Sequence, residues 1–570
     1  MTESRRDLNW KPLAAIAVVY LVACRVMLAP IVNFSHLGSA TFQGDVRLIV
    51  WTLAWDNHAI LSGARALFDA NIFFPSTETL AYSEHLFGIS VFTLPIYALT
   101  RNPVLAYNLV WILSYLLSAA AAHYLTFRHT RDHLASTVAG LTYAFCFFRM
   151  HHGHGHLHLL WGFWIPLALI AMERWLSTRS WKALWIFVAV VTAQALSSWY
   201  QAVMVFVAAA LFMFWVMVID PLMIGRSVRL QPDRRWLTRL ALQSVAGAAV
   251  ALAIIWPFAR HYHVLASGGP AEAAANAADL AAYLVPPENT FVGQWLIARG
   301  VKGPRWIWGE QTLFLGWLTL ALGAAGAWVS ILSREPKVRA LRFMILLGAA
   351  SIALSFGPTA GEVARATWGW SPFGILARIP GADLFRVPAR YAALLTLSVA
   401  VLAGAGCAAF HARVGRRARW ATAALIPFML AEFYVVDFPG GAPLPAPVPA
   451  AYRMIATLPP GPVLSLPDFA GTPVWFQEAD YQYFSTAHWH PIVNGYSRAE
   501  PPGFVERMRG MSAFPDSAAV AAIRDAGVRY VVVHAAQYPA GGADAVEKGR
   551  ASGGFRLLAR FENDYLFEIE

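Results

Sequence analysis

The chain has 570 residues, 58% of them hydrophobic and 14% charged, with a net charge of +11 and a mean hydropathy of +0.48. A soluble protein of this length cannot bury so much apolar surface, so the composition excludes a soluble globular protein and predicts a polytopic membrane protein. The positive charge does not indicate a nucleic-acid partner, because the basic residues lie mostly in short loops between apolar runs.

Apolar runs long enough to cross a bilayer follow one another along the chain. Residues 86–100 form a short apolar run interrupted by Pro95, which favours a re-entrant or surface-lying helix inside a first outer loop at 34–102. The predicted fold is therefore mostly α, a transmembrane helical bundle. We expect eleven spans, at residues 13–33, 103–127, 134–149, 159–177, 183–199, 201–219, 240–258, 311–332, 342–357, 390–411 and 421–438.

Basic residues are concentrated in alternate loops, and the short loops between these contain few. Because Lys and Arg mark the cytoplasmic side of a membrane protein, this pattern predicts a cytoplasmic N-terminus. Most acidic, His and Trp residues of the loops then fall on the outer face, where we expect the chemistry. The basic segments are 5–11, 128–131, 174–182, 226–239, 334–342 and 413–419.

The tail is expected to form a separate domain after the membrane domain, 1–438. Residues 439–450 are a Pro/Gly-rich linker, because PGGAPLPAPVPA cannot continue a helix. In 451–570, the segments 461–467 and 529–535 are typical of buried strands, and 555–570 of two strands around an Asn-Asp turn. With a helix at 517–527, the tail suits a small extracytoplasmic α/β domain.

Asp45 follows the first span, in Gly44-Asp45-Val46-Arg47, beside the predicted membrane surface. A charge placed there is costly and therefore indicates a function. Asp45 can take a proton from a hydroxyl that lies within hydrogen-bond reach, and Arg47 is a candidate substrate contact. The alternative is that Asp45 is the N-cap of the following helix, because Asp is a favoured cap; the two roles are compatible.

Further polar residues follow in the first outer loop. Asp56 lies on the same amphipathic stretch as Asp45, and Glu84 and His85 open the helix that returns to the bilayer. Glu84 suits a second carboxylate or a metal ligand, or simply the positive N-terminal end of that helix. All three are candidate substrate contacts.

A histidine-rich string, RMHHGHGHLH (149–158), lies at a predicted outer membrane edge. His152, His154 and His156 are candidate ligands for a divalent metal such as zinc, the one cofactor that the sequence indicates. A tight metal site normally draws on separate elements, so contact of Arg149, His156 and His158 with an anionic headgroup is the favoured alternative.

Arg386 and Arg390 flank Pro388 where the chain re-enters the membrane. Their guanidinium groups suit a phosphate, because the planar fork pairs well with phosphate oxygens. The alternative is snorkelling of long side chains at the interface. Other candidate substrate contacts are Trp199 and Tyr200, Glu310, and His488 and Asn494 in the segment 485–497, which we expect to fold back over the membrane site.

The chain contains no phosphate-binding loop, dinucleotide fingerprint or nucleophile elbow. Chemistry with ATP or a nucleotide sugar on the inner face therefore has no visible site. A lipid-linked donor used on the outer face requires none of these motifs.

The order of a cytoplasmic N-terminus, one span and a long outer loop carrying Gly44-Asp45 resembles the GT-C superfamily of integral-membrane glycosyltransferases. A closer resemblance, to a group of bacterial multi-pass membrane proteins in that superfamily, covers most of the chain. It rests on GDVRLIVWTLAWDNHAILSG (44–63), LFDANIFFPSTETLAYSEHLFG (67–88), ALSSWYQAV (195–203), FRVPARYAALL (385–395) and HWHPIVNGYS (488–497).

The resemblance implies a hexosyl- or pentosyltransferase that moves a sugar from a polyprenyl-phosphate donor to a lipid, glycan or protein acceptor. It places the reaction on the outer face of a bacterial inner membrane, with the C-terminal domain in the periplasm. It makes Asp45 the base for inverting attack and lets arginines hold the departing phosphate. Superfamily members often carry a second acid beside the first, whereas Gly44 and Val46 flank Asp45 here.

Two other classes remain open from the sequence. A transporter or flippase of a lipid-linked glycan requires polar residues along mid-membrane faces, and few are present beyond Arg25, Asn108 and Gln194. A non-catalytic envelope scaffold would use the outer domain to bind a partner. The polar enrichment of the outer face favours the enzyme.

Overall fold

The computed structural model divides into two compact units. Unit 1 is Met1–Phe34, Val110–Pro257 and Ala266–Pro439, and unit 2 is Ser35–Leu109, Phe258–Leu265 and Gly440–Glu570. The first outer loop thus belongs to the same unit as the tail. The structure describes residues 10–30, 32, 34, 44–63, 66–219, 234–265, 270–301, 309–359, 371–379, 384–436, 448–537, 554–562 and 564–570. The predicted linker 439–450 lies almost entirely outside the described residues.

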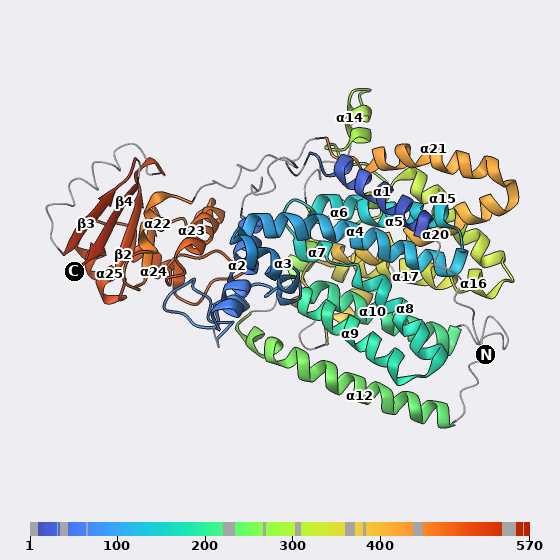
Figure 1. The fold of residues 1–570 in the computed structure, drawn as a ribbon, viewed down its shortest axis with the longest axis horizontal. Coiled ribbons are helices and arrows are strands. Elements are labelled where there is room, and N and C mark those ends of the chain that lie inside the picture. Colours follow the sequence, from blue (N-terminus) through green and yellow to red (C-terminus); the bar gives the residue numbers. More distant parts are fainter. Residues whose placement is uncertain are drawn as a thin grey trace. The chain divides into compact units, whose positions relative to one another are not determined.

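Unit 1 is built of helices (Figure 1). Its longer helices are α1 (Trp10–Met27), most of α4 (Pro103–Thr130), α5 (His133–Phe145), α8 (Trp164–Thr178), α9 (Trp181–Ser197), α10 (Trp199–Phe214), α12 (Arg234–Ala259), α15 (Trp317–Leu332), α17 (Arg342–Ser355), α20 (Ala392–Val414) and α21 (Arg416–Phe433). Short helices connect them: α6 (Phe147–His152), α7 (Leu157–Leu160), η2 (Trp215–Ile219), α13 (Pro270–Ala275), η4 (Ala281–Tyr283), α14 (Phe291–Ile297), α16 (Pro336–Arg339), η5 (Gly357–Thr359), α19 (Pro372–Leu376) and η7 (Pro388–Tyr391).

Helix α20 is the centre of unit 1 and packs against α5, α15 and α17. Small residues permit this close packing, as is common between membrane helices. A Cβ at Gly326 of α15 would lie 1.8 Å from the Leu402 carbonyl oxygen of α20, and one at Gly404 would lie 2.9 Å from the Ala135 carbonyl oxygen of α5. The backbones therefore meet without intervening side chains.

Six helical stretches among the described residues are long and apolar enough to cross a membrane, which agrees with the predicted polytopic class. They are Pro103–Thr130, Leu157–Thr178, Trp199–Ile219, Leu237–Val264, Pro336–Ser355 and Pro388–Val414, and Phe87–Thr100, Trp181–Ser197 and Trp317–Leu332 are shorter apolar helices.

Several predicted spans are not single uninterrupted α-helices. The span 134–149 ends at Phe145, because Cys146 has an extended ψ of 153°, and Arg149 lies in α6. The span 159–177 is divided between α7 and α8, and 201–219 ends in a π-helical turn from Trp215. The predicted number of eleven spans stays a prediction.

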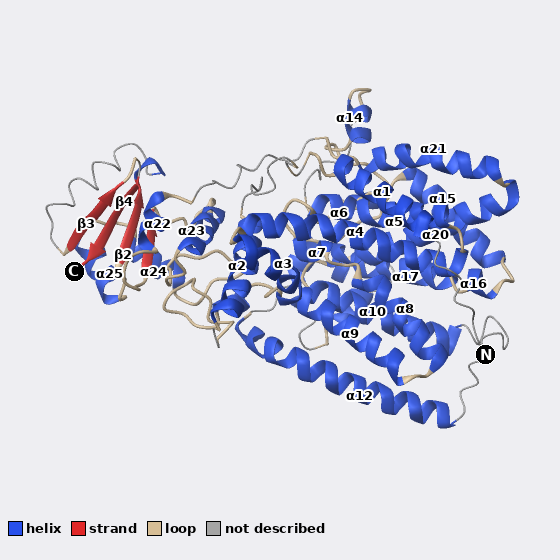
Figure 2. Cartoon of the chain, viewed as in Figure 1, coloured by secondary structure: helices blue, strands red, loops and turns tan. Residues whose placement is uncertain are grey.

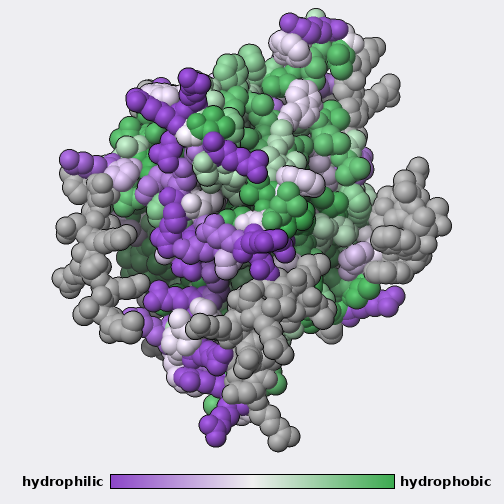
Figure 3. Space-filling view, turned by 90° about the vertical axis from the view of Figure 1, so that its right-hand side faces the viewer, coloured by the Kyte–Doolittle hydropathy of each residue, from purple (hydrophilic) through white to green (hydrophobic). Residues whose placement is uncertain are grey.

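Among the described residues, the basic segments 128–131, 174–182, 334–342 and 413–419 meet at one end of unit 1. The last turn of α4 contacts α8 through Arg128 and Glu173 (2.9 Å), and contacts α16 through His129 Nδ1 and the Lys337 carbonyl oxygen (3.1 Å). The N-cap of α5, Asp132, reaches α21, because its carboxylate lies 3.3 Å from Arg419. Figure 3 faces this end, and hydrophilic side chains gather across its centre with hydrophobic ones around them.

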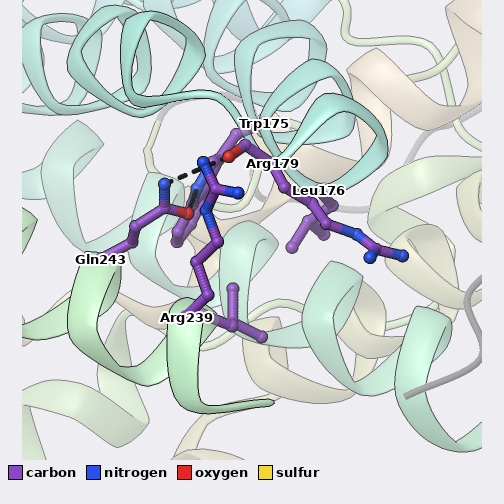
Figure 4. A pocket seen from close by; sticks show the side chains of 6 residues that line it. Trp175, Leu176, Arg179, Arg239 and Gln243 are labelled. Atoms are coloured by element: carbon purple, nitrogen blue, oxygen red, sulfur yellow. Dashed lines mark hydrogen bonds between the residues drawn. The ribbon is translucent and has the colours of Figure 1, made fainter. Parts of the chain in front are cut away.

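The turn between α8 and α9 is joined to α12 at the same end (Figure 4). The Trp175 indole N–H donates to Gln243 Oε1 (2.9 Å), and Gln243 Nε2 donates to the Arg179 carbonyl oxygen (3.2 Å). The cavity beside these groups is only about 10 Å³, so the contact is a packed helix junction and leaves no room for a substrate.

Unit 2 contains the strands of the described residues (Figure 2). Their sheet has the order β1 (Val463–Leu466), β2 (Tyr530–His534), β4 (Asp564–Ile569), β3 (Phe555–Arg560). Strands β1 and β2 are parallel, with Val463 opposite Tyr530, and the other two pairs are antiparallel. Helix α25 (Ser517–Asp525) precedes β2, so the predicted strands and helix of the tail are confirmed as elements.

The helices of unit 2 come from three stretches of the chain. The first loop supplies α2 (Asp45–Ser62), η1 (Thr79–Tyr82), α3 (Phe87–Thr100) and the start of α4. The segment 258–265 supplies η3 (Arg260–Val264), and the tail supplies α22 (Ala450–Ile455), η8 (Trp475–Gln477), α23 (Glu478–Phe484), η9 (Ser485–Ala487), α24 (Phe504–Met511), α25 and η10 (Ala535–Gln537). Helix α2 packs against both α3 and α23.

Candidate functional site

Asp45 is the first residue of α2, and the chain enters this helix through a tight turn at Gly44. Gly44 has a φ of 50°, and a Cβ there would lie 3.3 Å from both Phe476 Cβ and the Tyr496 hydroxyl. Gly44, not Asp45, occupies the N-cap position, and no side chain caps the helix. The predicted N-cap role of Asp45 is therefore wrong by one residue, although its carboxylate still lies at the positive end of the helix dipole.

A tyrosine of the tail holds the Asp45 carboxyl group. The Tyr496 hydroxyl donates a hydrogen bond to Asp45 Oδ1 over 2.7 Å, and the Tyr496 ring stacks on Trp475 at 4.6 Å. Burial, and then the neighbouring Asp45, raise the pKa of the Tyr496 hydroxyl, so it keeps its proton and remains a donor. The expected return of the segment 485–497 thus brings Tyr496 to Asp45.

Arg47 forms a buried ion pair with the tail. Its Nε lies 2.6 Å from Asp480 Oδ1 of α23, and Arg47 is 4% exposed. Burial lowers the pKa of Arg47 against the attraction of Asp480, and burial raises the pKa of Asp480 to about 6. This placement favours a role of Arg47 in fixing α2 to α23 over its predicted contact with substrate.

Asp56 and Asn57 are fully buried where α2 packs on α3. The Ser90 hydroxyl donates to Asp56 Oδ2 (2.5 Å), and Asn57 Nδ2 donates to the Thr93 hydroxyl (2.8 Å). Burial raises the pKa of Asp56 well above its ordinary value, which the Ser90 hydrogen bond only partly offsets. Asp56 is therefore placed as a neutral helix-packing residue rather than as a second catalytic acid.

Glu84 and His85 lie in the turn before α3. The His85 backbone N–H donates to the Tyr262 hydroxyl (2.9 Å), which itself donates to the Ser83 carbonyl oxygen (3.0 Å). His85 Nδ1 accepts from the Phe87 N–H (3.0 Å), and burial lowers the pKa of His85 to about 3. His85 is thus a neutral packing residue, and Glu84 is half-buried beside it.

The predicted tail residues His488 and Asn494 are both buried in the tail. The Ser465 N–H of β1 donates to Asn494 Oδ1 (2.7 Å), and Asn494 Nδ2 donates to Glu478 Oε2 (2.9 Å). Burial raises the pKa of Glu478 to about 8. His488 is buried against Tyr452, and burial lowers its pKa to about 3. These contacts favour structural roles for both predicted residues.

Unit 1 brings another group of predicted residues together. Arg390 of η7 pairs with Glu310 through Nε (3.1 Å to both carboxylate oxygens) and through its second nitrogen (2.5 Å). The Arg390 guanidinium lies 4.5 Å over the ring of Tyr200, and His152 Nε2 lies 3.5 Å from Glu310. Burial alone would raise the pKa of Glu310, but Arg390 and the nearby histidines hold it below its ordinary value.

The other predicted arginines have protein partners. Arg386 pairs with Glu272. Arg149 is 2% exposed and donates to the carbonyl oxygens of Ala144 (3.2 Å) and Ser114 (3.1 Å). The predicted contact of Arg149 with an anionic headgroup is thus disfavoured, because its guanidinium satisfies backbone oxygens inside the bundle.

The histidine string folds into α6 and the turn that follows it. His152 and His156 approach each other through their Nδ1 atoms at 3.1 Å, and His154 contacts the His151 carbonyl oxygen. His158 is half-buried in α7, and Trp199 is half-buried at the start of α10. The part of the chain that the structure describes has no group of three or more His, Cys, Asp or Glu side chains that could hold a metal.

Tyr496, Trp475 and Asp480 are the site residues that the sequence interpretation did not single out. Tyr496 and Asp480 contact Asp45 and Arg47 of the first loop across more than 400 residues of chain, and Trp475 stacks on Tyr496. The only local signal was the aromatic and polar composition of 485–497, which includes Tyr496.

Solved structures with a similar fold include an arabinofuranosyltransferase and an oligosaccharyltransferase. The arabinofuranosyltransferase AftD from Mycobacteria is 13% identical, with 99% of this chain and 40% of that chain covered, at a TM-score of 0.59. The Archaeoglobus fulgidus oligosaccharyltransferase is 14% identical in its apo form, with 93% and 70% covered and a TM-score of 0.50. With a tethered acceptor peptide containing the NVT sequon, it is 15% identical, with 92% and 69% covered and a TM-score of 0.50.

No family model and no curated protein sequence matches the chain. The chain spans less than half the length of AftD. At these identities the likeness establishes the fold alone. The fold expected from the GT-C resemblance is confirmed, and the protein is an integral membrane protein.

Proposed function

We propose that this chain, which has the GT-C fold, is a glycosyltransferase that moves a sugar from a polyprenyl-phosphate donor to an envelope lipid, glycan or protein. We place the reaction on the outer face of a bacterial inner membrane, with the N-terminus in the cytoplasm. The similar solved structures support the class of enzyme. The observation that carries the proposal is the Asp45 carboxylate, oriented by Tyr496 at the start of α2.

Asp45 is the proposed general base. It takes the proton of the acceptor hydroxyl while that oxygen forms a bond to the anomeric carbon of the sugar. The bond from this carbon to the phosphate oxygen breaks, and the polyprenyl phosphate leaves with the electron pair. The start of α2 and the Tyr496 hydrogen bond fix the position of the Asp45 carboxylate, which a base requires to reach the acceptor hydroxyl.

Arg390 is the proposed contact for the departing phosphate. Its planar guanidinium suits a phosphate, whose developing charge it would stabilise in the transition state. Both carboxylate oxygens of Glu310 bind the Arg390 guanidinium. A phosphate would therefore have to displace Glu310 or share the guanidinium with it. The Tyr200 ring under Arg390 fixes the plane of the guanidinium.

The test is mass spectrometry of lipids and envelope glycans from a strain that lacks the gene. The strain is rescued with the wild type, with Asp45→Asn, or with Asp525→Asn, an exposed carboxylate of the same unit that serves as control. We expect the wild type and the control to restore a missing glycan at equal membrane levels, and Asp45→Asn to fail. Equal rescue by Asp45→Asn would overturn Asp45 as the base and favour a transporter or scaffold.

Tyr496→Phe tests the orientation of the carboxylate separately. Removing the hydroxyl leaves the ring stacked on Trp475, so the fold is retained. We expect the same product at a lower rate, because the Asp45 carboxylate loses the hydrogen bond that orients it. An unchanged rate would contradict a positioning role for Tyr496.

A further inference from the structure

A cavity of about 640 Å³ lies where α20 ends and α21 begins, beside the start of α5. It is at the end of unit 1 where the basic loops meet, which Figure 3 faces. The volume is in the usual range for a small-molecule site. The residues that line it are Leu134, His411, Gly415, Arg416, Arg419, Trp420 and Ala423.

One wall of the cavity is fixed by hydrogen bonds. The buried His411 ring contacts Asp132 through Nδ1 (2.9 Å) and the Thr422 hydroxyl through Nε2 (2.9 Å). These contacts tie α5, α20 and α21 together, and so the wall keeps its shape whether or not a ligand is present.

The two arginines of the cavity are exposed. Arg419 lies 3.3 Å from Asp132, but its side chain is 62% exposed, and an exposed ion pair contributes little stability. Arg416 is exposed and begins α21. Both guanidinium groups can therefore turn to another anion at small cost.

The charge around the cavity is strongly positive. Residues 413–419 contain four arginines, and the sequence has no Asp or Glu between 412 and 431. Asp132 is the carboxylate that the structure places against these residues. One carboxylate does not balance four guanidinium groups, so the cavity attracts an anion.

The remaining lining is apolar. Trp420 is 66% exposed, and Leu134 and Ala423 lie beside it. Tryptophan settles at the membrane–water interface, and basic pockets between membrane helices suit anionic headgroups. A free phosphate would use the arginines but not this apolar part.

We propose that this cavity binds the headgroup of an anionic phospholipid, with the phosphate against Arg416 and Arg419 and the upper acyl chain against Trp420. The phospholipid is distinct from the sugar donor, and the site acts as a lipid anchor at the end of the bundle. Its existence does not depend on the glycosyltransferase activity.

The test uses the purified full chain in detergent, titrated with phosphatidylglycerol carrying brominated acyl chains. Bromine quenches a tryptophan that it contacts, so we expect a saturable component of quenching that disappears in Trp420→Phe. Brominated phosphatidylcholine should give a weaker, non-saturating signal. Inorganic phosphate at millimolar concentration should not compete, and effective competition would replace the lipid with a free phosphate as the occupant.

The charge requirement is tested with Arg416→Gln/Arg419→Gln. We expect about 25-fold weaker binding of phosphatidylglycerol, since each basic residue near an anionic lipid contributes about fivefold, or about 1 kcal/mol. The matched control is Arg413→Gln/Arg417→Gln, which removes the same charge from residues that do not line the cavity. Equal loss in both double variants would overturn the site in favour of a diffuse surface charge, and no loss in either would overturn it outright.

Discussion

The buried ion pair of Arg47 and Asp480 provides a sharp test of how unit 2 is held together. Burial shifts the pKa values of both partners toward their neutral forms, despite a separation of 2.6 Å. The free-energy cost of removing these charges from water therefore offsets much of their mutual attraction. Removing one partner leaves the other charge buried without its counter-ion, which typically lowers the free energy of unfolding by about 3–5 kcal/mol. Replacing both partners with apolar residues is often neutral or stabilising.

We accordingly expect Arg47→Met alone to destabilise the contact of α2 with α23 by about 3 kcal/mol, because Asp480 is partly exposed and recovers some solvation. Arg47→Met combined with Asp480→Leu should restore the stability to within about 1 kcal/mol of the wild type. Arg509→Met, an exposed arginine of the same unit, is the control.

Hydrogen exchange resolved along α2 and α23 in the full chain measures this directly, because it reports local opening. A loss of 3 kcal/mol corresponds to roughly 150-fold faster exchange in the single variant. If the double variant exchanges as fast as the single one, the desolvation argument is refuted. If the double variant is stable but inactive in the glycan rescue assay, Arg47 also contacts substrate.

Three further outcomes follow from single buried groups. The pKa of Glu478 is about 8 in the folded chain against about 4.3 in the unfolded chain. The free energy of unfolding therefore falls as the pH rises from about 5 to 8, by up to about 1.4 kcal/mol per pH unit. Glu478→Gln should flatten this slope in thermal unfolding, and an unchanged slope would exclude Glu478 as its source. Asp56→Asn keeps an oxygen that accepts the Ser90 hydrogen bond and removes a carboxyl group whose pKa is raised. The unfolding temperature of this variant should equal or exceed that of the wild type, by more at higher pH. A lower unfolding temperature than the wild type at pH 8 would show that Asp56 is ionised. Gly326→Val places a Cβ against the Leu402 carbonyl oxygen and should abolish a monodisperse peak in size-exclusion chromatography, whereas Gly510→Ala, with nothing within 4 Å of its Cβ, should not.

Local patterns predicted the elements well where one residue type dominates a segment. The apolar runs gave the helices of unit 1, and the Val-rich 529–535 gave β2, because periodicity and burial are properties of neighbouring residues. The helix breaks at Cys146 and Trp161 left no such signal, since both residues are compatible with a membrane helix.

The roles of the charged residues were harder to predict, because a partner far along the chain decides them. Arg149 looked suited to a headgroup, but the carbonyl oxygens of Ala144 and Ser114 bind it inside the bundle. Arg47 was predicted to contact substrate, but in the structure it pairs with Asp480. One sequence without coordinates does not specify such pairs.

The hydrogen bond between Asp45 and Tyr496 also sets an order of events during synthesis. The two residues are 451 positions apart. At about 5–20 residues per second, the ribosome adds Tyr496 roughly 20–90 s after Asp45. Throughout that interval α2 lacks both its tyrosine donor and the partner of Arg47. A nascent chain therefore contains the Asp45 carboxylate before the tyrosine that orients it, so that the Asp45–Tyr496 contact forms only after the tail has been synthesised.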